Sequence, residues 1–137
     1  MTKSELKSRV MTLGNKLAPR MGDRRAAFVE AWIIVKAGTV ELAVRGVSFG
    51  NRQEALRHLA RYNPALVRAV LVPEPANPAD PRAVAVMVGV QGGRGLYRLG
   101  YVPRNLAPVA AVLGGQIPRL RLVEGEYGRG ARVTLAV

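Results

Sequence analysis

The acidic and basic side chains of this chain are spaced in a way that favours binding of an anionic partner. Asp80 lies between two prolines, in the run from Asn77 to Pro81, which predicts an extended or turned backbone. Guanidinium groups beside predicted strand ends can follow a phosphate backbone. Each arginine that borders a predicted strand can also be interpreted as an ordinary solvated charge. Asp80 can also be interpreted as a residue that caps the turn. The arginines that border predicted strands are Arg45, Arg52, Arg82, Arg98 and Arg104.

Other kinds of site chemistry lack the residues they need. His58 is the only histidine, there is no cysteine, and the nine acids form no D-x-D or E-x-x-H pattern, so we expect no metal site and no nucleophilic triad. The glycine-rich run 89–95 lacks the Lys-Ser or Lys-Thr ending of a P-loop, and we interpret it as a hairpin tip. We therefore expect a non-catalytic protein without cofactors.

Aromatic residues make up only 5% of the chain, which limits any platform for stacking bases. Tyr97 and Tyr101 lie four residues apart in one predicted strand, so the two-residue period places them on the same side. Phe49 has two readings, as a base-stacking residue and as part of the core. The remaining candidates are Tyr62 and Tyr127.

The overall charge agrees with an anionic partner. Lys and Arg number 21 against 9 Asp and Glu, which gives a formal net charge of +12 over 137 residues. A strongly basic domain is a candidate for nucleic-acid binding. Since only 4 of the 21 basic residues are Lys and 17 are Arg, biased genomic nucleotide composition is an alternative explanation. No secretory signal and no run of about 18 apolar residues is present, so we expect a cytoplasmic protein, nucleoid-associated or in a host cell if phage-encoded.

Two helices are predicted in the first 38 residues. Thr2 and Glu5 form a capping-box pattern before a helix that we expect to end near Leu17, ahead of Pro19 and Gly22. Asp23 is the expected N-cap of a second helix with an apolar stripe through Phe28, Trp32 and Val35. A short helical hairpin is marginal alone in water, so it docks on the rest of the chain or pairs with a second subunit; we favour the second reading, a homo-oligomer.

The remainder, 39–137, predicts a strand-rich second domain. We expect short helices over 52–62, capped by Asn51, and near 104–113. The fold class is therefore α+β, a small OB-like or SH3-like barrel of about six strands after a helical hairpin. The expected strands cover 39–48, 66–72, 83–88, 96–102, 117–123 and 132–137.

Three segments carry a resemblance to a known family. They are Gly46-Val47-Ser48-Phe49-Gly50-Asn51-Arg52-Gln53-Glu54-Ala55, Glu74-Pro75-Ala76-Asn77-Pro78-Ala79-Asp80-Pro81-Arg82-Ala83-Val84-Ala85-Val86, and Leu99-Gly100-Tyr101-Val102-Pro103-Arg104. In this order and spacing the chain resembles the HIRAN domain over residues 40 to 137. The middle segment, E-P-x-N-P-x-D-x-x-A-V before a strand, is the most specific of the three.

The resemblance implies a modified OB-like barrel that captures single-stranded DNA ends with a free 3′-hydroxyl, as HIRAN domains of fork-remodelling helicases do. Residue by residue, it implies a polar contact at Ser48, base stacking at Phe49, acceptance of the terminal hydroxyl at Asp80, a polar contact at Tyr101 and a basic contact at Arg104. Two positions depart from that pattern. Ala79 replaces an aromatic residue that can precede the Asp, and Ser48 replaces a basic residue.

We thus expect a protein that binds single-stranded DNA or DNA 3′-ends in replication, repair or recombination, with DNA contacts at Ser48, Phe49, Asp80, Tyr101, Arg104, Arg52 and Arg82. Its partners are expected to be nucleic acid, a second copy through the N-terminal helices, and a helicase or other repair protein, with no membrane. An alternative is an oligomeric interaction adaptor whose barrel has lost end recognition. A nuclease is the weakest reading.

Overall fold

A computed structural model describes residues 1–46, 52–93, 95–113, 118–125 and 128–137. The chain divides into two compact units. The first comprises Met1–Val40 with Ala136–Val137, and the second comprises Glu41–Leu135. None of the described helices is both long and apolar enough to span a membrane.

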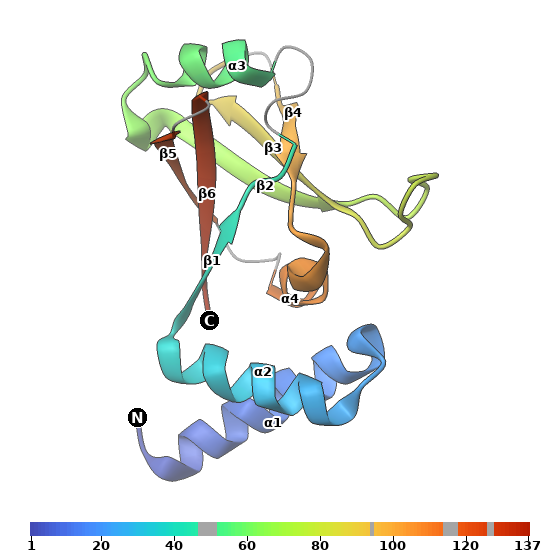
Figure 1. Cartoon of the computed structure of the whole chain (residues 1–137). Coiled ribbons are helices and arrows are strands. Elements are labelled where there is room, and N and C mark those ends of the chain that lie inside the picture. The colour runs from blue at the N-terminus through green and yellow to red at the C-terminus, as the bar shows by residue number, and fades with distance from the viewer. Residues whose placement is uncertain (47–51, 94, 114–117, 126–127) are drawn as a thin grey trace. The chain divides into compact units, whose positions relative to one another are not determined.

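The first unit is built on a helical hairpin, α1 (Lys3–Met21) and α2 (Arg24–Ala37) (Figure 1). The predicted N-caps are confirmed: Thr2 Oγ1 accepts from the Glu5 N–H at 3.1 Å, and Asp23 Oδ1 accepts from the Ala26 N–H at 3.0 Å. α1 extends past its expected end near Leu17 to Met21, just before the predicted break at Gly22. Pro19 lies in the last turn, where it removes a single helical hydrogen bond, so the helix continues beyond it. Gly22 caps the C-terminus of the helix in the left-handed conformation.

The two helices of the hairpin approach closely at Gly14 and Phe28. A Cβ atom on Gly14 would lie 2.6 Å from the Phe28 ring, so only glycine allows this packing. The expected stripe on α2 is divided, because Val35 is buried while Trp32 is 41% exposed. Val29 and Ile33 are exposed beside Trp32, which gives α2 an open apolar surface.

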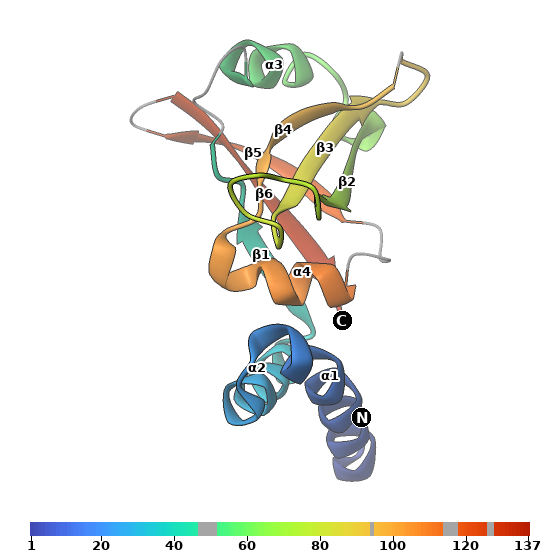
Figure 2. The ribbon, with the colours of Figure 1, turned by 90° about the vertical axis from the view of Figure 1, so that its right-hand side faces the viewer.

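The second unit contains two small antiparallel sheets of three strands each (Figures 1 and 2). One has the order β2-β3-β4 and the other the order β1-β6-β5, whose outer ends at Thr39–Val40 and Ala136 belong to the first unit. β2 and β5, from different sheets, are in contact. The α+β class is confirmed; the strand pairings among the described residues form two sheets and do not close into one barrel. The strands are β1 (Thr39–Ala43), β2 (Val67–Pro73), β3 (Val84–Val90), β4 (Tyr97–Tyr101), β5 (Arg119–Gly125) and β6 (Gly128–Ala136).

Short helices lie at opposite ends of the second unit: α3 (Arg52–Leu59) at one and α4 (Ala107–Leu113) at the other (Figures 1 and 2). A 3₁₀ turn, η2 (Arg104–Leu106), leads into α4, and another, η1 (Pro64–Leu66), precedes β2. The helix expected over 52–62 is shorter than predicted, and its expected cap Asn51 lies outside the described residues. Fully buried side chains from both sheets and both helices form the core: Leu42, Leu56, Leu59, Val84, Val86, Val88, Leu99, Val109, Val133 and Leu135.

A bulge in β4 corrects the prediction that Tyr97 and Tyr101 share a side. Tyr97 pairs with Val88 and Tyr101 pairs with Ala85, while the register shifts between Val86 and Met87. Since partners in an antiparallel pair share a face, and Val88 and Ala85 are three residues apart, the two tyrosines lie on opposite faces of the sheet. The extra residue of the bulge reverses the side-chain alternation beyond it.

Candidate functional site

The loop between β2 and β3 is held by the side chain of Asn77. Its Oδ1 atom accepts hydrogen bonds from the N–H groups of Ala79 at 2.9 Å and Asp80 at 3.2 Å. The loop is closed at its base, where the Glu74 N–H donates to the Ala83 carbonyl at 2.9 Å. Asn side chains commonly bond to the backbone two residues on, which explains why this Asn-Pro segment forms an ordered turn.

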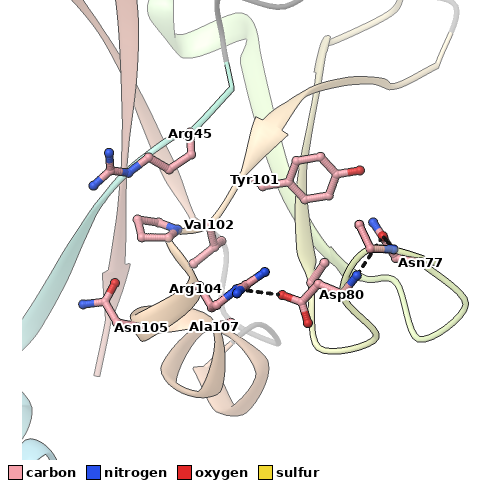
Figure 3. Close-up of a pocket in the computed structure, with 11 residues that line it drawn as sticks. Arg45, Asn77, Asp80, Tyr101, Val102, Arg104, Asn105 and Ala107 are labelled. Atoms are coloured by element: carbon pink, nitrogen blue, oxygen red, sulfur yellow. Dashed lines mark hydrogen bonds and ion pairs between the residues drawn. The ribbon is translucent and has the colours of Figure 1, made fainter.

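The side chain of Asp80, in the same loop, has two partners. Its Oδ1 accepts from the Arg82 N–H at 2.9 Å, which confirms the turn-capping reading. Its Oδ2 lies 3.5 Å from Arg104 Nε at the start of η2, as Figure 3 shows. The Asp80 side chain is 23% exposed and that of Arg104 is 83% exposed. The carboxylate is thus fixed by the turn, while the guanidinium reaches it from solvent.

A groove of about 710 Å³ opens around this ion pair. Apolar side chains, including Val102 and Ala107, contribute much of its lining, and Asp80, Arg104 and Tyr101 add polar groups (Figure 3). A concave apolar surface with a few placed polar groups is typical of a site for a small ligand or a chain end. The other described lining residues are Arg45, Asn77, Ala79, Ala83, Pro103 and Asn105.

A second hollow, of about 500 Å³, adjoins the groove and shares Asn77 and Tyr101 with it. Glu74 lines this hollow, and its carboxylate accepts hydrogen bonds from Tyr101 Oη at 2.9 Å and Asn77 Nδ2 at 3.1 Å. Arg98 forms an ion pair with the same carboxylate. Burial disfavours the charge, but these hydrogen bonds and the charge of Arg98 outweigh it, so the pKa of Glu74 lies below its usual value.

Tyr101 is held on two sides by this arrangement. Burial, with the bond to the Glu74 carboxylate, raises the pKa of its phenol. The Arg98 guanidinium lies 5.6 Å from the centre of the ring and that of Arg52 lies 6.0 Å from it, at cation–π distances. The bulge in β4 explains this geometry, because it places Arg98 and Tyr101 on the same face although they are three residues apart.

Gly100 allows the chain at Arg45 to pair closely with β4 beside the groove. The N–H groups of Arg45 and Tyr101 donate to each other's carbonyls at 2.7 and 2.8 Å. A Cβ atom on Gly100 would clash with the Arg45 carbonyl oxygen and would lie 2.7 Å from Val44 Cγ1. The glycine of the Leu99-Gly100-Tyr101 motif is therefore required by this close backbone approach.

Three of the residues predicted to contact DNA, Asp80, Tyr101 and Arg104, line the same groove. Arg52 lies near Tyr101, and its Nη1 donates to the Gly46 carbonyl at 2.6 Å. The backbone N–H of Arg82 donates to Asp80 in the turn. Arg82 is exposed and is not one of the described residues that line the groove. Ser48 and Phe49 lie outside the described residues.

The sequence alone predicted no role for two residues of the site, Glu74 and Asn77. Asn77 and Glu74 were part of the quoted motif, but only the fold shows that Asn77 shapes the loop and that Glu74 ties it to β4. The Asn-Pro dipeptide was the available signal for Asn77, whereas nothing local indicated the partners of Glu74, which lie 24 and 27 residues away. The part of the chain that the structure describes contains no cluster of three or more His, Asp or Glu side chains suited to a metal ion.

Comparisons with known proteins identify no family for this chain. No family model matches it, and no curated protein matches it. A crystal structure of a protein from Lactobacillus plantarum is similar, with 19% sequence identity and a TM-score of 0.41. The similarity covers 73% of this chain and 100% of that chain.

Proposed function

We propose that this protein is a non-catalytic module that binds single-stranded DNA, and in particular a DNA 3′-end, in replication, repair or recombination. The observation that carries the proposal is the meeting of Asp80 and Arg104 in one groove. A carboxylate accepts a hydrogen bond from a terminal hydroxyl, and a guanidinium beside it contacts the adjacent phosphate. The resemblance of these positions to the HIRAN pattern and the net charge of +12 support the same reading.

The dimensions of the groove favour a chain end over a duplex. A volume of about 710 Å³ suits a small ligand or about one nucleotide unit, with the loop 74–83 on one side and η2 on the other. Arg104 is 83% exposed, so its guanidinium is free to turn toward a phosphate, while Asp80 keeps the hydrogen bond from the Arg82 N–H. Tyr101 lines the wall of the groove while its hydroxyl donates to Glu74.

We further propose that the two sheets are the halves of an OB-like or SH3-like barrel. The contact of β2 with β5 supports it, since it brings an edge strand of each sheet together. Small barrels of this kind present grooves for single strands between their loops.

The test is fluorescence anisotropy with labelled oligonucleotides at physiological salt. Single strands ending in 3′-hydroxyl and in 3′-phosphate are compared with duplex DNA, for the wild type and for Asp80→Ala. We expect tight binding that requires both the free hydroxyl and Asp80. Equal binding of every polyanion would reduce the function to that of a general basic surface, and no binding would contradict the proposal.

A second candidate function rests on the exposed apolar surface of α2. Val29, Trp32 and Ile33 are 55%, 41% and 57% exposed, and a contiguous apolar surface often marks a protein interface. The alternative is therefore an adaptor that self-associates through the hairpin. Sedimentation velocity of the wild type and of a Val29→Ser, Ile33→Ser variant tests it, together with the oligonucleotide titrations above. An oligomer that the substitutions dissociate and that binds no oligonucleotide would favour the adaptor, and a monomer would reject it.

A further inference from the structure

A second basic surface lies on the solvent face of the β1-β6-β5 sheet. Strand β6 alternates: Ala131, Val133 and Leu135 are buried, while Arg132 and Thr134 between them face outward. On β5, Arg119 and Arg121 are exposed, and each pairs directly with one of those outward residues of β6. Because directly paired residues share a face, all of these outward side chains lie on one surface.

The central pair on this surface joins two like charges. Arg121 lies directly opposite Arg132 in the β5–β6 register, an arrangement that destabilises a sheet unless an anion lies between them. Glu41 of β1 fills that place in part, with its Oε1 2.8 Å from Arg121 Nη2 and 3.9 Å from Arg132 Nε. One carboxylate serves two guanidinium groups, and the side chains of Arg121 and Arg132 remain 66% and 46% exposed.

Arg45 connects this surface with the groove. Val40, Leu42 and Val44 are buried along the β1 segment, whereas Glu41 and Arg45 are exposed, so Arg45 follows the outward alternation of the sheet. Its backbone pairs with Tyr101, and it borders the Asp80 groove. In Figure 3 its guanidinium points away from Tyr101.

We propose that this sheet face is a second binding site, for the phosphate backbone of the strand whose end occupies the groove. The inference rests on the proposed function for its ligand. We define the phosphate track as Arg45, Arg119, Arg121 and Arg132. Among the interactions described on this face, Glu41 is the one carboxylate that offsets their charge. Arg119 and Arg121 stand two residues apart on one strand, so they contact successive phosphates of an extended chain.

The track has a quantitative consequence. Each single-strand phosphate that a cation neutralises contributes about −0.7 to the slope of log K against log salt. Contacts from Arg119, Arg121 and Arg132 therefore contribute about −2 in all. Between 50 and 200 mM salt this contribution weakens binding of a long strand roughly twentyfold. A tetranucleotide confined to the groove lacks it.

The experiment measures binding of a tetranucleotide and a 20-nucleotide dT strand, both with a 3′-hydroxyl, from 50 to 200 mM salt. The test variant is Arg119→Gln, Arg121→Gln, Arg132→Gln. The matched control is Arg57→Gln, Arg61→Gln, Arg68→Gln, which removes the same charge from α3, the segment after it and β2. Asp80→Ala is measured in parallel. Arg119→Gln alone, which leaves both bonds of Glu41 intact, serves if the triple variant unfolds.

At 200 mM salt we expect the test variant to bind the long strand at least tenfold more weakly than the wild type. The slope of log K against log salt is expected to become less negative by about 2. Binding of the tetranucleotide is expected not to change. Arg119→Gln alone is expected to lose about 0.7 from the slope. Equal effects of the test and control variants would overturn the track. If the test variant loses the slope but Asp80→Ala changes neither end preference nor affinity, the track stands and the proposed end recognition fails.

Discussion

Tyr101 Oη donates a hydrogen bond of 2.9 Å to Glu74 Oε1 and so joins β4 to the loop that carries Asp80. The two residues are 27 positions apart, and Arg98 and Asn77 bind the same carboxylate. Hydrogen bonds to an ionised group are about twice as strong as neutral ones. This cluster therefore fixes the shape of one wall of the groove.

Replacing Tyr101 by Phe removes this hydrogen bond and keeps the ring. We expect a loss of about 1.5–3 kcal/mol in the free energy of unfolding, because the acceptor is charged. Tyr97→Phe is the matched control, since the Tyr97 hydroxyl is buried without a hydrogen-bond partner among the described residues. Its removal is expected to be neutral or stabilising. Urea unfolding compares the two; an equal loss for both variants would contradict the role of the Glu74 bond.

Glu74 predicts an acid-sensitive contribution to stability. Its pKa is lowered in the folded state, so folding favours the ionised form. The contribution is complete above the unfolded pKa, near the ordinary value of 4.5, and is lost as the pH falls through the lower folded pKa. We expect the free energy of unfolding to fall more steeply from pH 6 to pH 3 for the wild type than for Glu74→Gln. Parallel curves would show that Glu74 carries no such linkage.

The sequence predicted where the helices and strands lie better than it predicted which side of a strand each residue faces. Hydrophobic periodicity and turn residues located the two helices of the hairpin and the six strands within a few residues, because these signals are local. The opposite faces of Tyr97 and Tyr101 could not be predicted, since the bulge depends on how β3 pairs with β4. For the same reason the partners of Glu74 were missed, as they come from a strand far along the chain.

Two substitutions at Asp80 separate its turn from its charge. Asn retains an oxygen that accepts from the Arg82 N–H but loses the ion pair with Arg104, whereas Ala loses both. We expect the free energy of unfolding of Asp80→Asn to lie within about 0.5 kcal/mol of the wild-type value. That of Asp80→Ala is expected to be lower by about 1 kcal/mol. Both are expected to lose preference for a free 3′-hydroxyl. A fully retained preference in Asp80→Asn would show that the charge is not what recognises the end.

Any side chain at Gly100 is predicted to destabilise the fold. A Cβ atom there meets the Arg45 carbonyl, a backbone atom that cannot move without breaking its pairing with Tyr101. We expect Gly100→Ala to cost about 1–3 kcal/mol. Gly130→Ala is the control in β6, where the added atom lies 3.3 Å from a Val123 side-chain methyl group that can adjust. Thermal unfolding distinguishes them, and equal melting temperatures would show that the strands can separate without loss.

Ala79 offers a gain-of-function test of the groove. It is exposed, lines the groove and immediately precedes Asp80, where HIRAN-type end binders can carry an aromatic residue. Stacking on an aromatic side chain contributes about 1–3 kcal/mol per base. We expect Ala79→Tyr to tighten binding of a 3′-hydroxyl single strand by about 5- to 150-fold, with a smaller effect on duplex DNA, whose bases are already stacked.

The control is Ala76→Tyr, an exposed position in the same loop that lines the neighbouring hollow with Glu74. It adds the same ring without placing it beside Asp80. Anisotropy titrations with both strand types compare the variants. If Ala76→Tyr tightens binding as much as Ala79→Tyr, the strand lies over the loop as a whole, and the terminal base does not sit at Asp80.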